Sequence, residues 1–287
     1  MDTGIPEKTV TLGVVAICRN EERDMAGFLE GLRGWVDDIV LIDDGSRDGT
    51  ARVIEQYADL PVRFICSPRT EGEYFSDQRN KGIDASTCDW LLHLDIDERI
   101  LPGLAAEIRS CIARSDRDAY RFRRLNYFLH HPMRGGGWQH WNLPHLARRE
   151  VLRFGGMFHE TCTLSVEDER VGQLKEPIWH LNDSSYAERM RKSLQYGDEL
   201  SARLARRVRH IRWYHFLFLP ILEWFRKFVW QCGFRDGIAG LILAGHSACA
   251  TFRACVLLWE KANAVGRKDL EDDVRAAWLR TRDEGVS

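Results

Sequence analysis

The sequence lacks several features that would assign it to a class of protein at once. Its eight cysteines include no C-x-x-C pair and no short-spaced group with histidine, so nothing predicts a structural zinc site. Residues 1–8 are polar and carry charges of both signs, without the apolar core of a secretion signal. We therefore expect free thiols and a cytoplasmic location.

Two further absences concern charge and hydrophobic length. The chain has 41 basic and 43 acidic residues and a formal charge of −2, so no overall positive field predicts binding to nucleic acid. The longest apolar stretch, 238–250, is interrupted by His246 and falls short of the roughly 20 residues that span a bilayer. We expect a chain that can lie on a membrane but does not cross one.

Apolar, β-branched segments alternate with helical patterns in the N-terminal third of the chain. The expected strands are 10–18, 39–42, 62–66 and 90–94, and the expected helices follow residue 22 and cover 50–57 and 76–85. This alternation predicts βαβ units, and hence an α/β fold with a mostly parallel sheet covered by helices on both faces. The chain has 287 residues and 44% hydrophobic composition, enough to bury a full core.

Polar side chains gather where the expected strands end. The first strand runs into Arg19-Asn20-Glu21, the second into Asp43-Asp44-Gly45-Ser46, and the strand 90–94 into Asp95-Ile96-Asp97. The carboxyl ends of parallel strands meet in one crevice, where ligands bind. Two aspartates at such an edge offer the hard oxygen ligands that suit Mg²⁺ or Mn²⁺ bridging a diphosphate. A D-x-D tripeptide also occurs in ordinary acidic loops, but a solvated loop needs no apolar run before it.

Four segments together resemble glycosyltransferase family 2, in the order and at the spacing usual for that family. They are 16–22 (A-I-C-R-N-E-E), 41–50 (L-I-D-D-G-S-R-D-G-T), 79–82 (R-N-K-G) and 94–98 (L-D-I-D-E). The last of these is similar to the form in bacterial lipopolysaccharide core glucosyltransferases, as are the segments 158–160, 233–237 and 259–260. The resemblance implies a GT-A fold.

The resemblance also implies which residues bind the donor. Arg19, Asn20, Glu21 and Asp44 would hold the base and ribose of a nucleotide-sugar, and Arg79 would lie near the base and diphosphate. Many members have tyrosine where this chain has Arg19, which puts the stacking contact to the base in doubt. Simpler interpretations stay open, since Glu21 could only favour a helix N-terminus and Arg79 could be a solvated helix residue.

A metal site is implied in the same way. Asp95 would face the ribose and the metal, Asp97 would be the direct ligand to Mg²⁺ or Mn²⁺, and His180 would be a third ligand. A purely structural role for His180 is the alternative.

An inverting transfer needs a general base, because the acceptor hydroxyl is a poor nucleophile until its proton is removed. Asp95 and Asp97 are assigned to nucleotide and metal, so the base is expected later in the chain. Glu160 matches the histidine-glutamate pair of the lipopolysaccharide group, and Asp183 is the second choice.

We expect two domains. Residues 1–184 would form the GT-A domain, with a nucleotide-sugar half at about 9–115 and an acceptor half at about 116–184. Residues 185–287 would be helical, because Ser185 and Glu188 have the spacing of a capping box. This part of the chain is also rich in arginine and aromatic residues. This region either lies on an anionic membrane surface, on the inner face of the cytoplasmic membrane, or packs its aromatic side chains as core.

These observations predict an inverting, metal-dependent glycosyltransferase. The donor would be a nucleotide diphosphate-sugar, with UDP-hexose preferred, and the acceptor a glycan or glycolipid such as lipopolysaccharide core. Two alternatives stay open, a polyprenyl-phosphate glycosyltransferase and an inactive, membrane-associated GT-A-like binding module. A nucleotidyltransferase is disfavoured because residues 19–22 contain no glycine.

Overall fold

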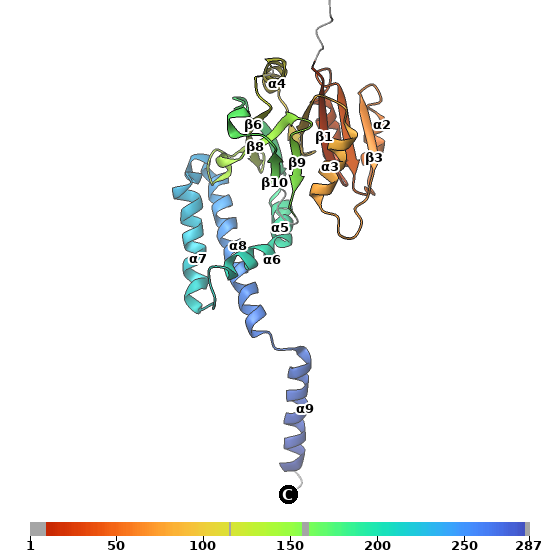
Figure 1. The fold of residues 1–287 in the computed structure, drawn as a ribbon. Coiled ribbons are helices and arrows are strands. Elements are labelled where there is room, and N and C mark those ends of the chain that lie inside the picture. The colour runs from red at the N-terminus through yellow and green to blue at the C-terminus, as the bar shows by residue number, and fades with distance from the viewer. Residues whose placement is uncertain (1–9, 115, 157–160, 285–287) are drawn as a thin grey trace, which may run out of the picture. The chain divides into compact units, whose positions relative to one another are not determined.

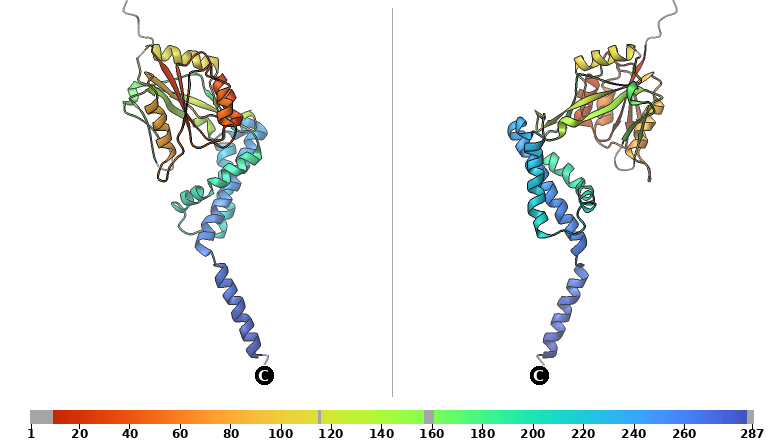
Figure 2. Two further views of the ribbon diagram at one scale, coloured as in Figure 1. Left: turned by 90° about the vertical axis from the view of Figure 1, so that its right-hand side faces the viewer. Right: turned by 60° about the vertical axis from the view of Figure 1, so that its left-hand side comes forward.

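The chain divides into two compact units, which meet between Ser184 and Ser185. The computed structural model describes residues 10–114, 116–156 and 161–284 (Figures 1 and 2). The first unit carries the β-sheet and the second is helical, and each is described by itself below.

The first unit is built on a ten-stranded sheet in the order β3-β2-β1-β4-β8-β6-β12-β5, with β7 and β11 also paired to β6. Its strands are β1 (Leu12–Cys18), β2 (Asp38–Asp43), β3 (Val62–Cys66), β4 (Trp90–His93), β5 (Glu98–Arg99), β6 (Ala119–Phe128), β7 (His131–Pro132), β8 (Asn142–Arg148), β11 (Val171–Gln173) and β12 (Ile178–Asp183). The first four are mutually parallel, which confirms the predicted βαβ units. Beyond β4 the sheet is mixed, because β8 runs antiparallel to both β4 and β6. A separate hairpin pairs β9 (Leu152–Gly155) with β10 (Thr161–Leu164).

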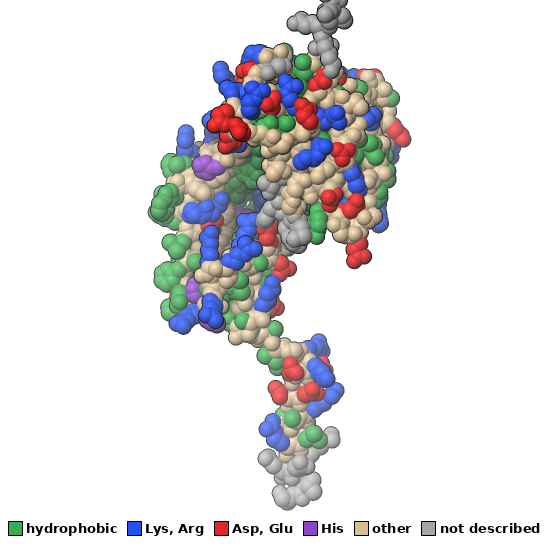
Figure 3. All heavy atoms as spheres, in the orientation of Figure 1, with side chains coloured by type: hydrophobic (Ala, Val, Ile, Leu, Met, Phe, Trp, Pro, Cys, Tyr) green, Lys and Arg blue, Asp and Glu red, His purple; other side chains and the backbone are tan. Residues whose placement is uncertain are grey.

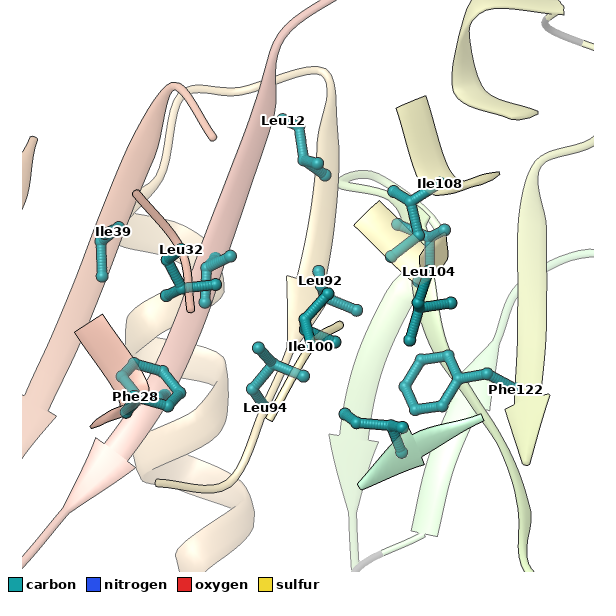
Figure 4. Packing of buried hydrophobic residues seen from close by; sticks show 14 of the residues in the cluster. Leu12, Phe28, Leu32, Ile39, Leu92, Leu94, Ile100, Leu104, Ile108 and Phe122 are labelled. Atoms are coloured by element: carbon teal, nitrogen blue, oxygen red, sulfur yellow. The ribbon is translucent and has the colours of Figure 1, made fainter. Parts of the chain in front are cut away.

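Helices cover both faces of this sheet, as predicted. They are α1 (Glu22–Glu30), α2 (Thr50–Glu55), α3 (Phe75–Ala85) and α4 (Pro102–Arg114). Successive strand residues point to opposite faces. Leu12 and Val14 of β1 therefore join a core cluster with α1 and α4, part of which Figure 4 shows, whereas Val15 joins a second cluster with Ile83 of α3.

Helix α3 approaches the sheet closely at Gly82. A Cβ atom built on this glycine would lie 2.3 Å from Cγ1 of Val15, so only glycine allows the approach. Because side chains alternate between the two faces of a sheet, His93, which pairs with Val15, lies on the face of β4 that α3 covers. Arg79 lies about one helical turn before Ile83 on α3. This packing brings Arg79 and His93 together at the end of β4.

The second unit is helical, as expected. Its helices are α5 (Tyr186–Gln195), α6 (Gly197–Ala205), α7 (Trp213–Phe225), a π-helical turn η3 (Arg226–Trp230), α8 (Gly237–Asn263) and α9 (Arg267–Glu284). Ser185 caps α5, since its Oγ accepts a hydrogen bond from the Glu188 backbone N–H at 3.2 Å.

The apolar helix of this unit is longer than the stretch 238–250 predicted from the sequence. The helical stretch Gly233–Asn263 has 31 residues and a mean hydropathy of 1.6 in its most apolar window, enough to cross a bilayer by length and composition alone. The apolar pattern continues past His246 because the helix does not end there. Only 28% of that window is buried, and aromatic side chains such as Trp213 and Trp230 are largely exposed.

Candidate active site

The ends of three neighbouring strands form the rim of the candidate site. Strand β1 pairs in parallel with β2 on one side and β4 on the other, and Cys18 lies opposite Asp43. The polar segments that follow these strands therefore lie along one edge of the sheet. Arg19, Asp44 and Asp95 come from the three different strand ends.

Asp44 is held by two arginines at this edge. Its Oδ1 accepts a hydrogen bond from the Arg69 backbone N–H at 2.8 Å, and its Oδ2 accepts one from Arg69 Nε at 2.8 Å and one from Arg19 Nη1 at 3.4 Å. Burial alone would raise the pKa of Asp44, but the hydrogen bonds from Arg69 outweigh it and lower the pKa. The Arg69 guanidinium lies 3.8 Å from the centre of the Phe75 ring. Sequence reasoning missed Arg69, although it too follows the end of a strand.

Asn20 and Glu21 tie neighbouring loops together. The Asn20 side-chain oxygen accepts a hydrogen bond from the Arg47 backbone N–H at 2.8 Å, and the Glu21 backbone N–H donates one to Thr50 Oγ1 at 2.8 Å. Burial, together with the nearby carboxylates of Asp97 and Asp24, raises the pKa of Glu21 to about 7. Contacts of these two residues with a nucleotide remain a prediction.

Asp95 lies between two guanidinium groups. Arg79 Nη1 is 3.1 Å from its Oδ1, and Arg124 Nη2 is 3.2 Å from its Oδ2. Burial works in the opposite direction, but the two arginines hold the pKa of Asp95 well below its usual range. Because both oxygens are engaged by arginine, the geometry favours an anchoring role for Asp95, and its role as a metal ligand remains a prediction.

Arg79 is not a solvated helix residue, since its side chain is only 13% exposed. Its Nη1 also lies 2.8–2.9 Å from the ring nitrogens of His93, which is fully buried. Burial and the neighbouring Arg79 lower the pKa of His93 well below its ordinary value, so the ring is neutral and can accept a hydrogen bond from Arg79. Nothing in the local pattern around His93 had indicated this contact.

Glu98 fixes the turn that carries the two aspartates. Its Oε2 accepts a hydrogen bond from the Asp95 backbone N–H at 2.9 Å, and its Oε1 lies 2.5 Å from Arg124 Nη2. Glu98 is fully buried, which raises its pKa to about 7 although the ion pair with Arg124 opposes the shift. Arg124 comes from β6, a strand whose pairing the sequence did not predict.

Asp97 and His180 face each other across the site. His180 Nε2 is 3.1 Å from Asp97 Oδ2, and His180 Nδ1 is 2.7 Å from Asn126 Oδ1. The Asn126 amide nitrogen donates to the Trp138 carbonyl at 3.3 Å, which turns its oxygen toward the histidine. Both ring nitrogens of His180 therefore face an oxygen atom, and in the tautomer whose Nδ1 donates to Asn126 the Nε2 lone pair points toward the Asp97 carboxylate.

This arrangement fits a divalent cation. Two lone-pair donors about 3 Å apart can bind one ion, and a histidine ligand commonly donates its other N–H to an oxygen, which Asn126 Oδ1 places 2.7 Å from His180 Nδ1. Within residues 10–114, 116–156 and 161–284, no group of three or more His, Cys, Asp or Glu side chains could hold a metal. The remaining ligands would be oxygen atoms of a diphosphate or of water.

Of the two residues predicted as the general base, Glu160 and Asp183, the structure describes only Asp183. Glu160 lies outside the described residues. Asp183 ends β12, is 2% exposed, and lines a cavity of about 400 Å³ together with Arg23, Tyr127 and His130. The role of either residue as the base remains a prediction.

The chain is similar to several known proteins. The model of the family described as "Glycosyl transferase family 2" matches residues 13–167. "Lipopolysaccharide core biosynthesis glycosyltransferase LpsC" of Rhizobium meliloti is 24% identical over 276 residues, which cover 91% of this chain and 96% of LpsC. A TPR repeat-containing protein of Synechococcus elongatus is 27% identical over 62% of this chain and 46% of its own length. The crystal structure of S. aureus TarS 1–349 has a TM-score of 0.47 at 14% identity and covers 88% of this chain and 92% of TarS 1–349.

Proposed function

Because the chain belongs to glycosyltransferase family 2, and is thus a glycosyltransferase, we propose that it transfers a hexose from UDP-hexose to lipopolysaccharide core or another cell-envelope glycan. The transfer would invert the anomeric configuration and depend on Mg²⁺ or Mn²⁺. The observation that carries this proposal is the Asp97–His180–Asn126 arrangement beside the strand ends.

The positions of the charged groups support one orientation of the donor. The nucleoside would lie against Asp44, which Arg69 orients. The diphosphate would extend toward Asp97 and His180, past Arg79. The chemistry supplied by Mg²⁺ or Mn²⁺ when bound there is neutralisation of the charge on the departing diphosphate. Arg79 would reinforce that effect, since Asp95 and His93 hold its guanidinium in place.

A general base completes the reaction. It would remove the proton from the acceptor hydroxyl as the oxygen bonds to the anomeric carbon and the bond from that carbon to the diphosphate breaks. We assign this step to Glu160, with Asp183 as the second candidate because it lines a neighbouring cavity.

The similarity to LpsC across almost the full length of both chains supports lipopolysaccharide core as the acceptor. We assign donor binding to residues 9–115, acceptor binding to residues 116–184 and membrane attachment to residues 185–287. Exposed aromatic side chains in the last region, including Trp213 and Trp230, support a peripheral position on the inner face of the cytoplasmic membrane.

A thermal-shift panel of nucleotide sugars, each with Mn²⁺ or with a chelator, tests the proposal. A donor at about 100 times its dissociation constant adds about 2.7 kcal/mol of stability. We expect UDP-hexose with Mn²⁺ to give the largest shift, and Asp97→Asn to lose it. Asp168→Asn is the matched control, because Asp168 is 88% exposed. Equal stabilisation with and without metal would contradict the metal site, and donor binding without transfer to any glycan would favour an inactive binding module.

A further inference from the structure

A cavity of about 580 Å³ lies within the second unit, among α6, α7 and α8. Part of its lining is apolar, with Leu200 and Leu204 from α6 and Leu222 from α7. Three arginines also line it, Arg203, Arg207 and Arg226. The cavity therefore combines a hydrophobic wall with a group of positive charges.

The charges of this lining do not cancel. Arg226 forms two hydrogen bonds with Glu223, the single acidic residue among the described lining residues, and Arg203 pairs with Glu199 at 2.6 Å. Among the described residues, the Arg207 side chain has no hydrogen bond or ion pair. An anion would complete the charge balance, and guanidinium groups suit phosphate in particular.

A buried histidine on the same wall has a ring nitrogen that makes no hydrogen bond among the described residues. His246 of α8 lines the cavity and is 7% exposed, and within the described chain its Nδ1 makes no hydrogen bond. Burial, followed by the nearby charges of Arg189 and Arg253, lowers the pKa of His246 to about 4, so the ring is neutral at physiological pH. Buried polar atoms are nearly always paired, so Nδ1 of His246 can take one hydrogen bond from a group in this cavity.

The apolar wall continues onto the exposed surface of α7. Leu222 lines the cavity and is 62% exposed, and Phe218 and Phe225 lie on the same helical face, 57% and 50% exposed. Figure 3 shows hydrophobic and basic side chains side by side on this part of the second unit. An alkyl chain that leaves the cavity would therefore meet apolar side chains along this face of the helix.

We propose that this cavity binds the phosphate headgroup and the first acyl carbons of an anionic lipid. The volume of the cavity, about 580 Å³, is much larger than a phosphate ion requires. The described lining residues include no Phe, Tyr or Trp on which a nucleotide base could stack, so a lipid fits better than a nucleotide. The inference rests on the membrane attachment proposed above and specifies the site that recognises the lipid.

The test uses the full chain and a soluble probe, dihexanoyl phosphatidic acid below its micellar concentration, in a calorimetric titration. The double variant Arg203→Gln/Arg207→Gln should lower the affinity by at least about tenfold, since a charged hydrogen bond to phosphate is lost. Arg206→Gln/Arg209→Gln is the matched control, because these arginines are exposed, as Arg203 and Arg207 are, but do not line the cavity, and its affinity should change less than about twofold.

A second variant tests the cavity itself. Ala250→Trp keeps every charge but fills the space, and should abolish binding of the probe while an unchanged helical circular-dichroism signal shows that the second unit is folded. Equal losses in the two arginine pairs would overturn the proposal in favour of general electrostatic attraction. Inorganic phosphate binding as tightly as the lipid would also overturn it, because the apolar wall would then contribute nothing. If vesicles bind but the soluble lipid does not, membrane attachment stands and the headgroup site is rejected.

Discussion

Asn126 would touch neither donor nor acceptor in the proposed arrangement, yet its Oδ1 lies 2.7 Å from His180 Nδ1 and can accept the proton that leaves Nε2 free for a metal. We predict that Asn126→Ala raises the Mn²⁺ concentration for half-maximal transfer by about 10–100-fold, with little change in the rate at saturating Mn²⁺. A metal titration of transfer measures both quantities. Asn142→Ala serves as the control, since Asn142 is exposed and bonds Gln173 away from the site. An unchanged metal requirement in Asn126→Ala would assign His180 a structural role.

The general base gives a second prediction at this scale. Glu160→Gln should keep its affinity for the nucleotide-sugar while transfer falls by about 10²–10⁴-fold, because the hydroxyl proton is no longer accepted. Comparing the donor-dependent thermal shift with the single-turnover rate separates the two effects. Near-normal transfer by folded Glu160→Gln would move the role elsewhere, with Asp183→Asn the next variant to measure.

Several site residues could not be predicted from the sequence, for one physical reason. Asp44, Asp95 and Asp97 end or follow apolar strands, so a local pattern places them at the sheet edge. His93 and Arg124 matter only through partners elsewhere in the chain, and in the sequence each looks like an ordinary strand residue.

At the scale of elements, the contact between α3 and β1 makes a measurable prediction. Gly82→Ala should cost about 1–3 kcal/mol of unfolding free energy, since its methyl group would overlap the fully buried Val15. Urea unfolding measures the loss. Gly103→Ala, on α4, should be neutral or slightly stabilising because its nearest neighbour is 3.8 Å away. If the overlap is the cause, Gly82→Ala combined with Val15→Ala should cost less than the sum of the two single changes.

The sequence predicted elements where the pattern is local. Strands β1 to β4 alternate with helices, and the right-handedness of βαβ connections leaves only a few arrangements of them. The order beyond β4 depends on pairing between distant segments, such as β6 with both β8 and β12. Hydrophobic patterns do not specify such partners. The length of α8 was missed because a histidine was read as an interruption, although a long helix tolerates one polar residue on a buried face.

For the whole molecule, we predict binding to anionic vesicles that weakens with salt but does not vanish. Arginine attraction is screened by salt, whereas insertion of exposed aromatic side chains is not. Trp213→Ala/Trp230→Ala should reduce vesicle affinity by at least about tenfold at high salt. Co-sedimentation over a salt series measures this. Trp141→Ala is the control, because Trp141 is 45% exposed but belongs to the first unit. Complete release at high salt would contradict a contribution from the aromatic side chains and would attribute membrane attachment to the arginines alone.

The ion pairs that link Arg79, Asp95, Arg124 and Glu98 restrict how these positions can change during evolution. Their charges alternate, and each inner member contacts two neighbours. Replacing Arg124 leaves the buried Glu98 without its ion-pair partner, and replacing Asp95 removes the carboxylate that Arg79 contacts, at a cost of about 3–5 kcal/mol. The four positions should therefore covary among relatives. For the same reason, loss of transfer in Asp95→Ala would not by itself identify a metal ligand, because that substitution also removes a contact of Arg79 and a contact of Arg124.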